Sequence, residues 1–151
     1  MSATVSIEPV VKKLILNADP QQAFDHFTRN IHLWWPLQTH SLSQSDAETV
    51  VFEAATGGRI YEIEKSGKER EWGRVTCCEP PHRLVFSWVL EAPDKATEVE
   101  VQFVEAGAGE TALTLIHRGW DKRPDGAEWR DKYNEGWDGV LARFGEAMDP
   151  R

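Results

Sequence analysis

The sequence is poor in cysteine, in basic residues relative to acidic ones, and in long apolar runs. It has two cysteines in 151 residues, Cys77 and Cys78. Neighbouring residues on a strand point to opposite faces, so this pair suits neither a disulfide nor a shared metal ion. The 17 basic and 25 acidic residues give a net charge of −8, which argues against nucleic acid or an anionic membrane as the main partner. The longest apolar run, residues 84–90, is interrupted by Ser87 and is far shorter than the roughly 18 residues of a membrane span.

Signals for targeting and for common catalytic sites are also missing. The first residues, Met-Ser-Ala-Thr-Val-Ser, lack the basic start and apolar core of a signal peptide, so we expect a soluble cytoplasmic protein. The five histidines show no metal-ligand spacing, and there is no Gly-x-Ser-x-Gly motif and no phosphate-binding glycine loop. We therefore predict no metal, no cofactor and no catalytic group. No linker or repeat divides residues 1–151, and we expect one domain.

The most informative stretch runs from Gly126 to Met148. At about 100° per residue its large apolar side chains fall on one stripe of a helix, with charged residues on the remainder. The stripe comprises Trp129, Tyr133, Trp137, Val140, Leu141, Phe144 and Met148. Gly136 lies at the edge of this stripe, where a missing side chain allows close backbone approach or leaves room for a guest molecule. Two interpretations follow: the helix packs on a sheet, or it covers a cavity.

The preceding residues alternate between apolar and polar side chains, which is typical of strands. The expected strands cover residues 10–16, 50–52, 59–65, 72–78, 84–88, 99–103 and 111–118, and one of the turns between them contains Pro93 and Asp94. After the first strand, Asp19, Pro20 and Gln22 provide the N-cap, first position and capping box of a short helix, and a second helical segment precedes Pro36. The pattern predicts an α+β helix-grip fold, a curved antiparallel sheet wrapped around the long C-terminal helix.

Several short motifs occur in a characteristic order over residues 8–148. They are Ala18-Asp19-Pro20, Trp34-Trp35-Pro36, Gly57-Gly58-Arg59, Tyr61-Glu62, Trp72-Gly73-Arg74-Val75, Pro80-Pro81-His82-Arg83-Leu84-Val85-Phe86-Ser87-Trp88, Thr114-Leu115-Ile116-His117-Arg118-Gly119-Trp120 and Gly136-Trp137. This series resembles the proteins homologous to the activator of the heat-shock-protein-ninety ATPase, in the START-like (SRPBCC) superfamily with the birch-pollen-allergen fold. The resemblance implies a cavity between the long helix and the sheet. Members of the superfamily bind apolar molecules or lipids there, and some catalyse aromatisation or cyclisation.

Strand alternation and the helix stripe together predict which residues face this cavity. The expected ligand-binding residues are Trp34, Tyr61, Trp88, Phe103, Leu115, His117, Trp137 and Leu141. Aromatic walls suit planar apolar ligands, but seven tryptophans also suit a plain core, and His117 equally suits a hydrogen-bonded core histidine.

We favour binding of an apolar or aromatic small molecule without catalysis. The alternatives are an enzyme of the cyclase or aromatase type that uses His117 and Tyr61, and a chaperone-interacting protein. The chaperone role is the weakest, because the eukaryotic co-chaperone carries a separate N-terminal domain for which this chain has no room. The sequence leaves open whether the protein forms a homodimer.

Overall fold

The computed structural model describes residues 7–89 and 96–148 of the chain, so the predicted turn at Pro93 and Asp94 lies outside the described residues. The helical segments are α1 (Pro20–Phe27), α2 (Gly126–Met148) and the short 3-10 helices η1 (Ile31–Leu33), η2 (Gln44–Asp46) and η4 (Trp120–Lys122). The strands are β1 (Val10–Leu16), β2 (Ala47–Phe52), β3 (Arg59–Glu64), β4 (Glu69–Glu79), β5 (Arg83–Trp88), β6 (Thr97–Gly107) and β7 (Glu110–Arg118).

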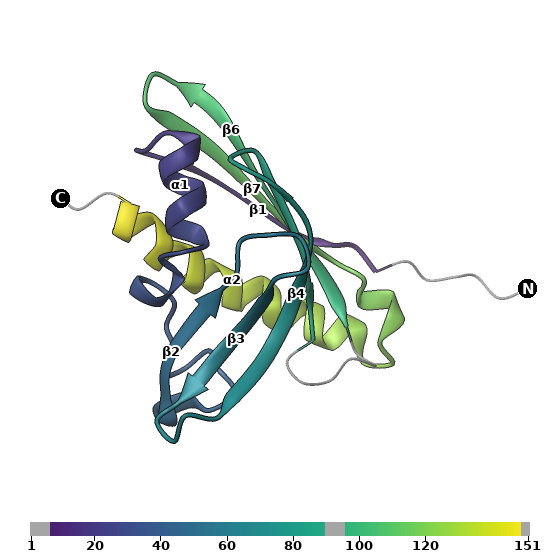
Figure 1. Ribbon diagram of the computed structural model, residues 1–151. Helices are drawn as coiled ribbons and strands as arrows, with labels where there is room; N and C mark the ends of the chain where they lie inside the picture. Colours follow the sequence, from purple (N-terminus) through teal and green to yellow (C-terminus); the bar gives the residue numbers. More distant parts are fainter. Residues whose placement is uncertain (1–6, 90–95, 149–151) are drawn as a thin grey trace, which may run out of the picture.

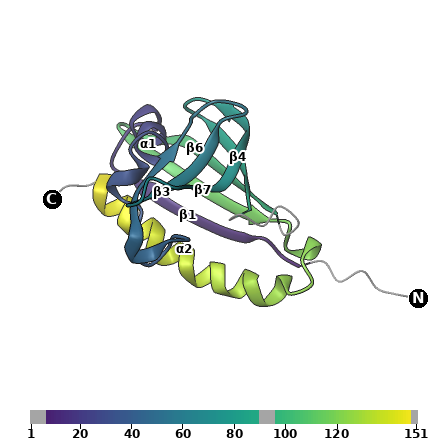
Figure 2. The ribbon, with the colours of Figure 1, turned by 60° about the horizontal axis from the view of Figure 1, so that its bottom comes forward.

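Within the described residues the seven strands form one antiparallel sheet in the order β1-β7-β6-β5-β4-β3-β2. Irregularities in register interrupt four of the pairings, including β3 with β4 and β4 with β5. Such bulges bend strands and increase their twist. The sheet curls accordingly, and α2 lies along its concave side (Figures 1 and 2). This arrangement confirms the predicted helix-grip fold.

The local signals at both helices are also confirmed. At the start of α1, the Asp19 carboxylate accepts a hydrogen bond from the Gln22 backbone N–H at 2.8 Å, and the Gln22 side chain accepts one from the Asp19 N–H at 3.1 Å. Together they form the predicted capping box. The α2 helix continues unbroken through Gly136 and buries Trp137 and Phe144. No helix in the described segments is long and apolar enough to cross a bilayer.

Aromatic rings fill the middle of the space between α2 and the sheet. Phe27 of α1 lies 5.4 Å from Phe144 of α2, 6.0 Å from Phe103 of β6 and 5.3 Å from Trp34, measured between ring centroids. The inward positions of β6, such as Val101 and Phe103, are fully buried, as the alternation predicts. The centre of the grip is therefore a packed core, and free space can remain only toward its ends.

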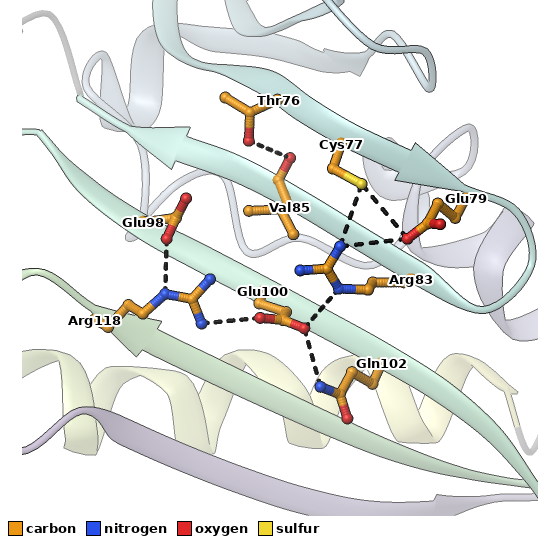
Figure 3. A network of polar contacts seen from close by, with 9 residues as sticks. All are labelled: Thr76, Cys77, Glu79, Arg83, Val85, Glu98, Glu100, Gln102 and Arg118. Carbon is orange, nitrogen blue, oxygen red and sulfur yellow. Dashed lines mark hydrogen bonds and ion pairs between the residues drawn. The ribbon is translucent and has the colours of Figure 1, made fainter.

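A network of charged side chains covers the opposite face of β5, β6 and β7 (Figure 3). Glu100 accepts hydrogen bonds from Arg83 at 2.8 Å and from Arg118 at 2.9 Å, and a further one from Gln102. The bond from Arg83 is the largest influence that lowers the pKa of the Glu100 carboxyl, to about 2. Its side chain is only 9% exposed, because the two arginines cover it. Ion pairs on this face therefore connect β6 to its neighbours β5 and β7.

Candidate functional site

A cleft with a volume of about 420 Å³ opens between α2, the end of β5 and the segment that follows η1. That size falls within the roughly 300–1,000 Å³ typical of small-molecule sites. The cleft is lined by Trp35, Thr39, His40, Ser41, Leu42, Gln44, Trp88, Trp129, Lys132, Tyr133, Gly136, Trp137 and Val140. Most of these residues come from α2 and from residues 35–44, and Trp88 of β5 is the one lining residue from a strand.

Three tryptophans form the inner wall of the cleft. The ring centroid of Trp35 lies 5.9 Å from those of both Trp88 and Trp137, and the latter two are 6.2 Å apart. Each indole N–H donates to the protein itself: Trp35 to the His40 carbonyl, Trp88 to the Tyr133 hydroxyl and Trp137 to His117. The N–H groups are therefore satisfied internally. Only 3–7% of each tryptophan is exposed, so each ring presents a small apolar part of its surface to the cleft.

Tyr133 adds one polar group to this apolar wall. Its hydroxyl oxygen accepts the Trp88 indole N–H at 2.9 Å, which leaves the hydroxyl proton to be donated. Burial raises the pKa of the Tyr133 phenol, and the bond from Trp88 and the charge of Arg123 oppose that shift only in part. The phenol is consequently neutral near pH 7 and suited to donate a hydrogen bond to a ligand oxygen.

His117 stands behind the wall and does not line the cleft. It is fully buried, its Nδ1 accepts the Trp137 indole N–H at 3.0 Å, and its Nε2 lies 2.7 Å from the Thr97 hydroxyl. Because Nδ1 accepts, the ring proton is assigned to Nε2, which donates to Thr97. Burial, and secondarily the charge of Arg123, lowers the pKa of His117 to about 3. Both nitrogens are occupied and the ring is neutral, which matches the hydrogen-bonded core histidine and leaves no lone pair for a base.

A buried carboxylate holds the outer wall of the cleft in place. Glu62 of β3 has no exposed surface, and it accepts hydrogen bonds from the backbone N–H groups of Leu42 at 2.6 Å and Ser43 at 2.8 Å, and from the Trp72 indole at 2.6 Å. Burial on its own would raise the pKa of Glu62. The bonds from Ser43, Trp72 and Leu42 outweigh burial, and the pKa lies below its ordinary value. Glu62 thus anchors the segment that carries His40, a lining residue.

The prediction that Tyr61 faces the cavity is wrong. Ile60 and Glu62 are the buried residues of β3, so Tyr61 between them lies on the opposite face of the strand. There the Arg59 guanidinium sits over the Tyr61 ring, 4.1 Å from its centroid. The prediction assigned the wrong face of β3 to the interior because the residue that faces inward, Glu62, carries a carboxylate. Three donors within the protein, the N–H groups of Leu42 and Ser43 and the Trp72 indole, make its burial possible. Tyr61 and His117 are not brought together as the cyclase alternative requires.

The other predicted residues divide between cleft and core. Trp88 and Trp137 line the cleft. Four other predicted residues do not line the cleft and are buried in the core: Trp34, Phe103, Leu115 and Leu141. The binding roles of all these residues remain predictions.

Two lining residues, Trp35 and Tyr133, are absent from the predicted ligand-binding set, although the sequence pattern places Trp35 at the cavity mouth or on the surface and Tyr133 on the apolar stripe. Tyr133 precedes Trp137 by one helical turn on the same stripe, and Trp35 follows Trp34 in a short helical segment. In the described part of the chain, no three His, Cys, Asp or Glu side chains are arranged to hold a metal ion, and both cysteines are free thiols.

Comparison with known proteins agrees with this architecture. The family model described as "Activator of Hsp90 ATPase homolog 1-like protein" matches residues 17–149. No curated protein sequence matches the chain significantly.

Three solved structures illustrate the range of similar proteins. CalC, a self-sacrificing resistance protein from Micromonospora echinospora, is 27% identical over 95% of each chain with a TM-score of 0.72. The anthrahydroquino-gamma-pyrone synthase Txn09 is 33% identical over 93% of this chain and 97% of its own, with a TM-score of 0.66. The Aha1 dimer from Colwellia psychrerythraea is 18% identical over 95% and 97%, with a TM-score of 0.67, and supports the fold alone.

Proposed function

The chain belongs to the family of activator of Hsp90 ATPase homolog 1-like proteins, and from that premise we propose that it binds an apolar, ring-containing small molecule in the cleft. The observation that carries the proposal is the wall of Trp35, Trp88 and Trp137, whose N–H groups are all satisfied within the protein. Because these N–H groups already have acceptors within the protein, an apolar guest against the wall leaves none of them without a hydrogen-bond partner. A flat aromatic surface gains most from it.

The expected affinity follows from the area that such a guest would bury. An aromatic guest that hides about 200 Å² of apolar surface gains on the order of 5 kcal/mol at roughly 25 cal/mol per Å². The entropy lost on association reduces this gain, and a hydrogen bond from Tyr133 adds about 1 kcal/mol. The sum is at most about 6 kcal/mol, so we expect simple three-ring compounds to bind with dissociation constants of roughly 50 μM or weaker, and more tightly as more ring surface reaches the wall.

Gly136 supports a guest rather than close packing. A Cβ atom built at this position would meet no atom within 4 Å, and Gly136 lines the cleft. Glycine inside a helix costs about 1 kcal/mol relative to alanine. No neighbouring backbone packs closely against Gly136. The space beside this glycine is therefore part of the cleft.

The name of one similar protein suggests a class of ligand. Txn09 is by name a synthase of an anthrahydroquino-gamma-pyrone, and it is 33% identical to this chain. Fused aromatic rings that bear carbonyl oxygens fit the tryptophan wall through their faces and Tyr133 through an oxygen. We propose polycyclic aromatic ketones as the ligand class, with Tyr133 as the hydrogen-bond donor.

Titration calorimetry with anthraquinone and with decanoic acid tests the proposal. The ring compound should bind the wild-type protein, and Trp88→Leu and Trp137→Leu should each weaken that binding. Leu33→Ala serves as the control, because Leu33 is 63% exposed and does not line the cleft. Binding of anthraquinone that ignores both tryptophan changes would place the site elsewhere.

A second candidate function is catalysis on the same ligand class, and the similarity to Txn09 favours it. In that case Tyr133 would supply a proton to a ligand carbonyl, since both nitrogens of His117 are occupied. A homodimer also stays a prediction. The similar Colwellia protein was solved as a dimer, but at 18% identity.

A further inference from the structure

The cleft carries no acidic side chain although the chain is strongly acidic. The sequence has 25 acidic residues and a net charge of −8. Among the described residues, those that line the cleft include Lys132 and His40 but no aspartate or glutamate. Tyr133 is the one other ionisable group there, and it is a neutral phenol. No carboxylate therefore lines the cleft, although Glu62 lies behind its outer wall and Asp125 beside Trp129.

Lys132 brings a positive charge to the mouth of this cleft. Its ammonium lies 4.6 Å from the centroid of the Trp129 ring, a cation–π contact that directs it toward the lining. Glu128 and Glu135 lie one helical turn away on α2, yet within residues 7–89 and 96–148 none of the ion pairs includes Lys132. Lys132 is exposed and has no carboxylate partner in this part of the chain.

A second cation lies near the same ring. The Arg123 guanidinium is 5.0 Å from the Trp129 centroid and pairs with Asp125 at 3.2 Å. Asp125 also accepts the Trp129 indole N–H at 2.7 Å and does not line the cleft. The charge of Arg123 acts to lower the pKa of both His117 and Tyr133, so its positive potential extends to the inner wall. Because Asp125 pairs with Arg123, we expect Lys132 to carry any preference for an anionic ligand.

We propose that the ligand is an anion, a ring compound whose carboxylate or phenolate oxygen meets Lys132 at the mouth while its rings lie against the tryptophan wall. This inference rests on the proposed function and adds the ligand's charge to it. The mouth is wet, so the ion pair is worth only a modest factor in affinity, about threefold to tenfold. That factor distinguishes anionic from neutral ligands of the same shape. It also depends on salt, because exposed charges are screened.

The test compares two probes that differ in charge and little in shape: anthraquinone-2-carboxylate and 2-(hydroxymethyl)anthraquinone. Dissociation constants are measured by calorimetry at low and high sodium chloride for the wild type, Lys132→Gln and Lys132→Glu. We expect the carboxylate to bind the wild type about threefold to tenfold more tightly at low salt. The preference should disappear in Lys132→Gln, reverse in Lys132→Glu and shrink at high salt. The neutral probe should bind all three alike.

Lys68→Gln is the matched control, because Lys68 is an exposed lysine in the turn between β3 and β4 and does not line the cleft. It removes the same charge from the protein and should leave the preference intact. Equal binding of both probes by the wild type would overturn the anion inference and leave the proposed function standing. A preference that survives Lys132→Gln would also overturn it. If neither probe binds, the proposed function itself fails.

Discussion

The indole N–H of Trp137 on α2 donates to Nδ1 of His117 on β7 across 3.0 Å. Nε2 of the same ring donates to the Thr97 hydroxyl at 2.7 Å, and Thr97 in turn donates to the Trp88 carbonyl at 3.4 Å. One chain of hydrogen bonds therefore joins two residues of the inner wall, Trp137 and Trp88, through His117 and Thr97 of the sheet. His117 serves this chain as a neutral connector, and its protonation would break the bond to Trp137.

The first prediction is that the protein loses stability as pH falls from about 6.5 toward 3. In this window the unfolded chain protonates His117 near its ordinary pKa of 6.5, whereas the folded protein resists protonation down to about pH 3. The unfolded state then binds more protons, so the free energy of unfolding falls by up to about 1.4 kcal/mol per pH unit. Urea denaturation at pH 7.5, 6.5, 5.5 and 5.0 measures the slope.

His117→Gln is the comparison for this slope. The amide can accept from Trp137 and does not titrate, so the variant should be less stable at pH 7.5 yet depend less on pH. His26, whose pKa burial also lowers, acts in the same direction and leaves a residual slope. An unchanged slope in the variant would mean that His117 titrates normally in the folded protein.

The second prediction concerns the packed centre of the grip. Phe103 has no exposed surface, and its ring meets those of Phe24 at 5.5 Å and Phe27 at 6.0 Å. Phe103→Ala should lower the free energy of unfolding by about 3–5 kcal/mol, because it leaves a cavity among rings that cannot close up. The next residue, Val104, is 57% exposed on the other face of β6, and Val104→Ala should change stability by less than about 0.5 kcal/mol. Similar denaturation midpoints for the two variants would reverse the assignment of faces.

The sequence predicted the fold well because its signals are local. The alternation in β6, the capping box at Asp19 and the stripe on α2 each depend on residues a few positions apart. None needs knowledge of what lies across the sheet. Because these local patterns leave few ways to cover the wide apolar face of α2, the architecture could be predicted as well.

The site was predicted less well because distant contacts decide it. Arg59 to Glu64 alternates in a way that permits either face to be buried, and the contacts of Glu62 with Leu42 and Ser43 settle the choice from some 20 residues away. The extent of the cavity depends on volume. Phe27 and Phe144 fill the centre of the grip, and no local pattern shows how far their rings reach.

The third prediction concerns the anchor of the cleft's outer wall. Glu62→Gln replaces one acceptor oxygen by an N–H₂ group that faces a backbone N–H, and should cost about 1–3 kcal/mol. Hydrogen exchange at Leu42 and Ser43 should become faster. The pKa of Glu62 is lowered, so its stabilisation is complete above about pH 4.5 and is lost as pH falls below that value. Glu48→Gln, at an exposed position of β2, is the control and should leave both measurements unchanged.

The fourth prediction separates helix stability from ligand binding at Gly136. Gly136→Ala should stabilise α2 by up to about 1 kcal/mol, since nothing obstructs the added methyl group. Gly136→Leu should keep the fold but occupy the cleft, and should weaken binding of anthraquinone by about tenfold or more, equivalent to about 1.4 kcal/mol. Gly139 is the matched control. A Cβ there also meets nothing within 4 Å, yet Gly139 does not line the cleft, so Gly139→Leu should leave binding intact.

The last prediction assigns the hydrogen-bond donor of the cleft to Tyr133. A suitable pair of probes is 9-fluorenone and fluorene, which share their ring shape and differ by one carbonyl oxygen. In the wild type the ketone should bind about fivefold more tightly, the equivalent of one net hydrogen bond of about 1 kcal/mol. Tyr133→Phe removes the donor and should abolish this preference without weakening fluorene, whose binding depends on ring contact.

One complication can be designed out of the Tyr133 experiment. Tyr133→Phe also deprives the Trp88 indole N–H of its acceptor, so this N–H could donate to the ketone instead. The double variant Trp88→Phe with Tyr133→Phe removes both donors, and comparison with Trp88→Phe alone gives the contribution of the phenol. The preference for fluorenone should persist in Trp88→Phe and vanish in the double variant. The other two indole N–H groups of the inner wall, those of Trp35 and Trp137, are already bonded to the His40 carbonyl and to His117, so they do not replace the two removed donors. A ketone preference that survives in the double variant would therefore place the carbonyl at the mouth, beside His40 and Lys132.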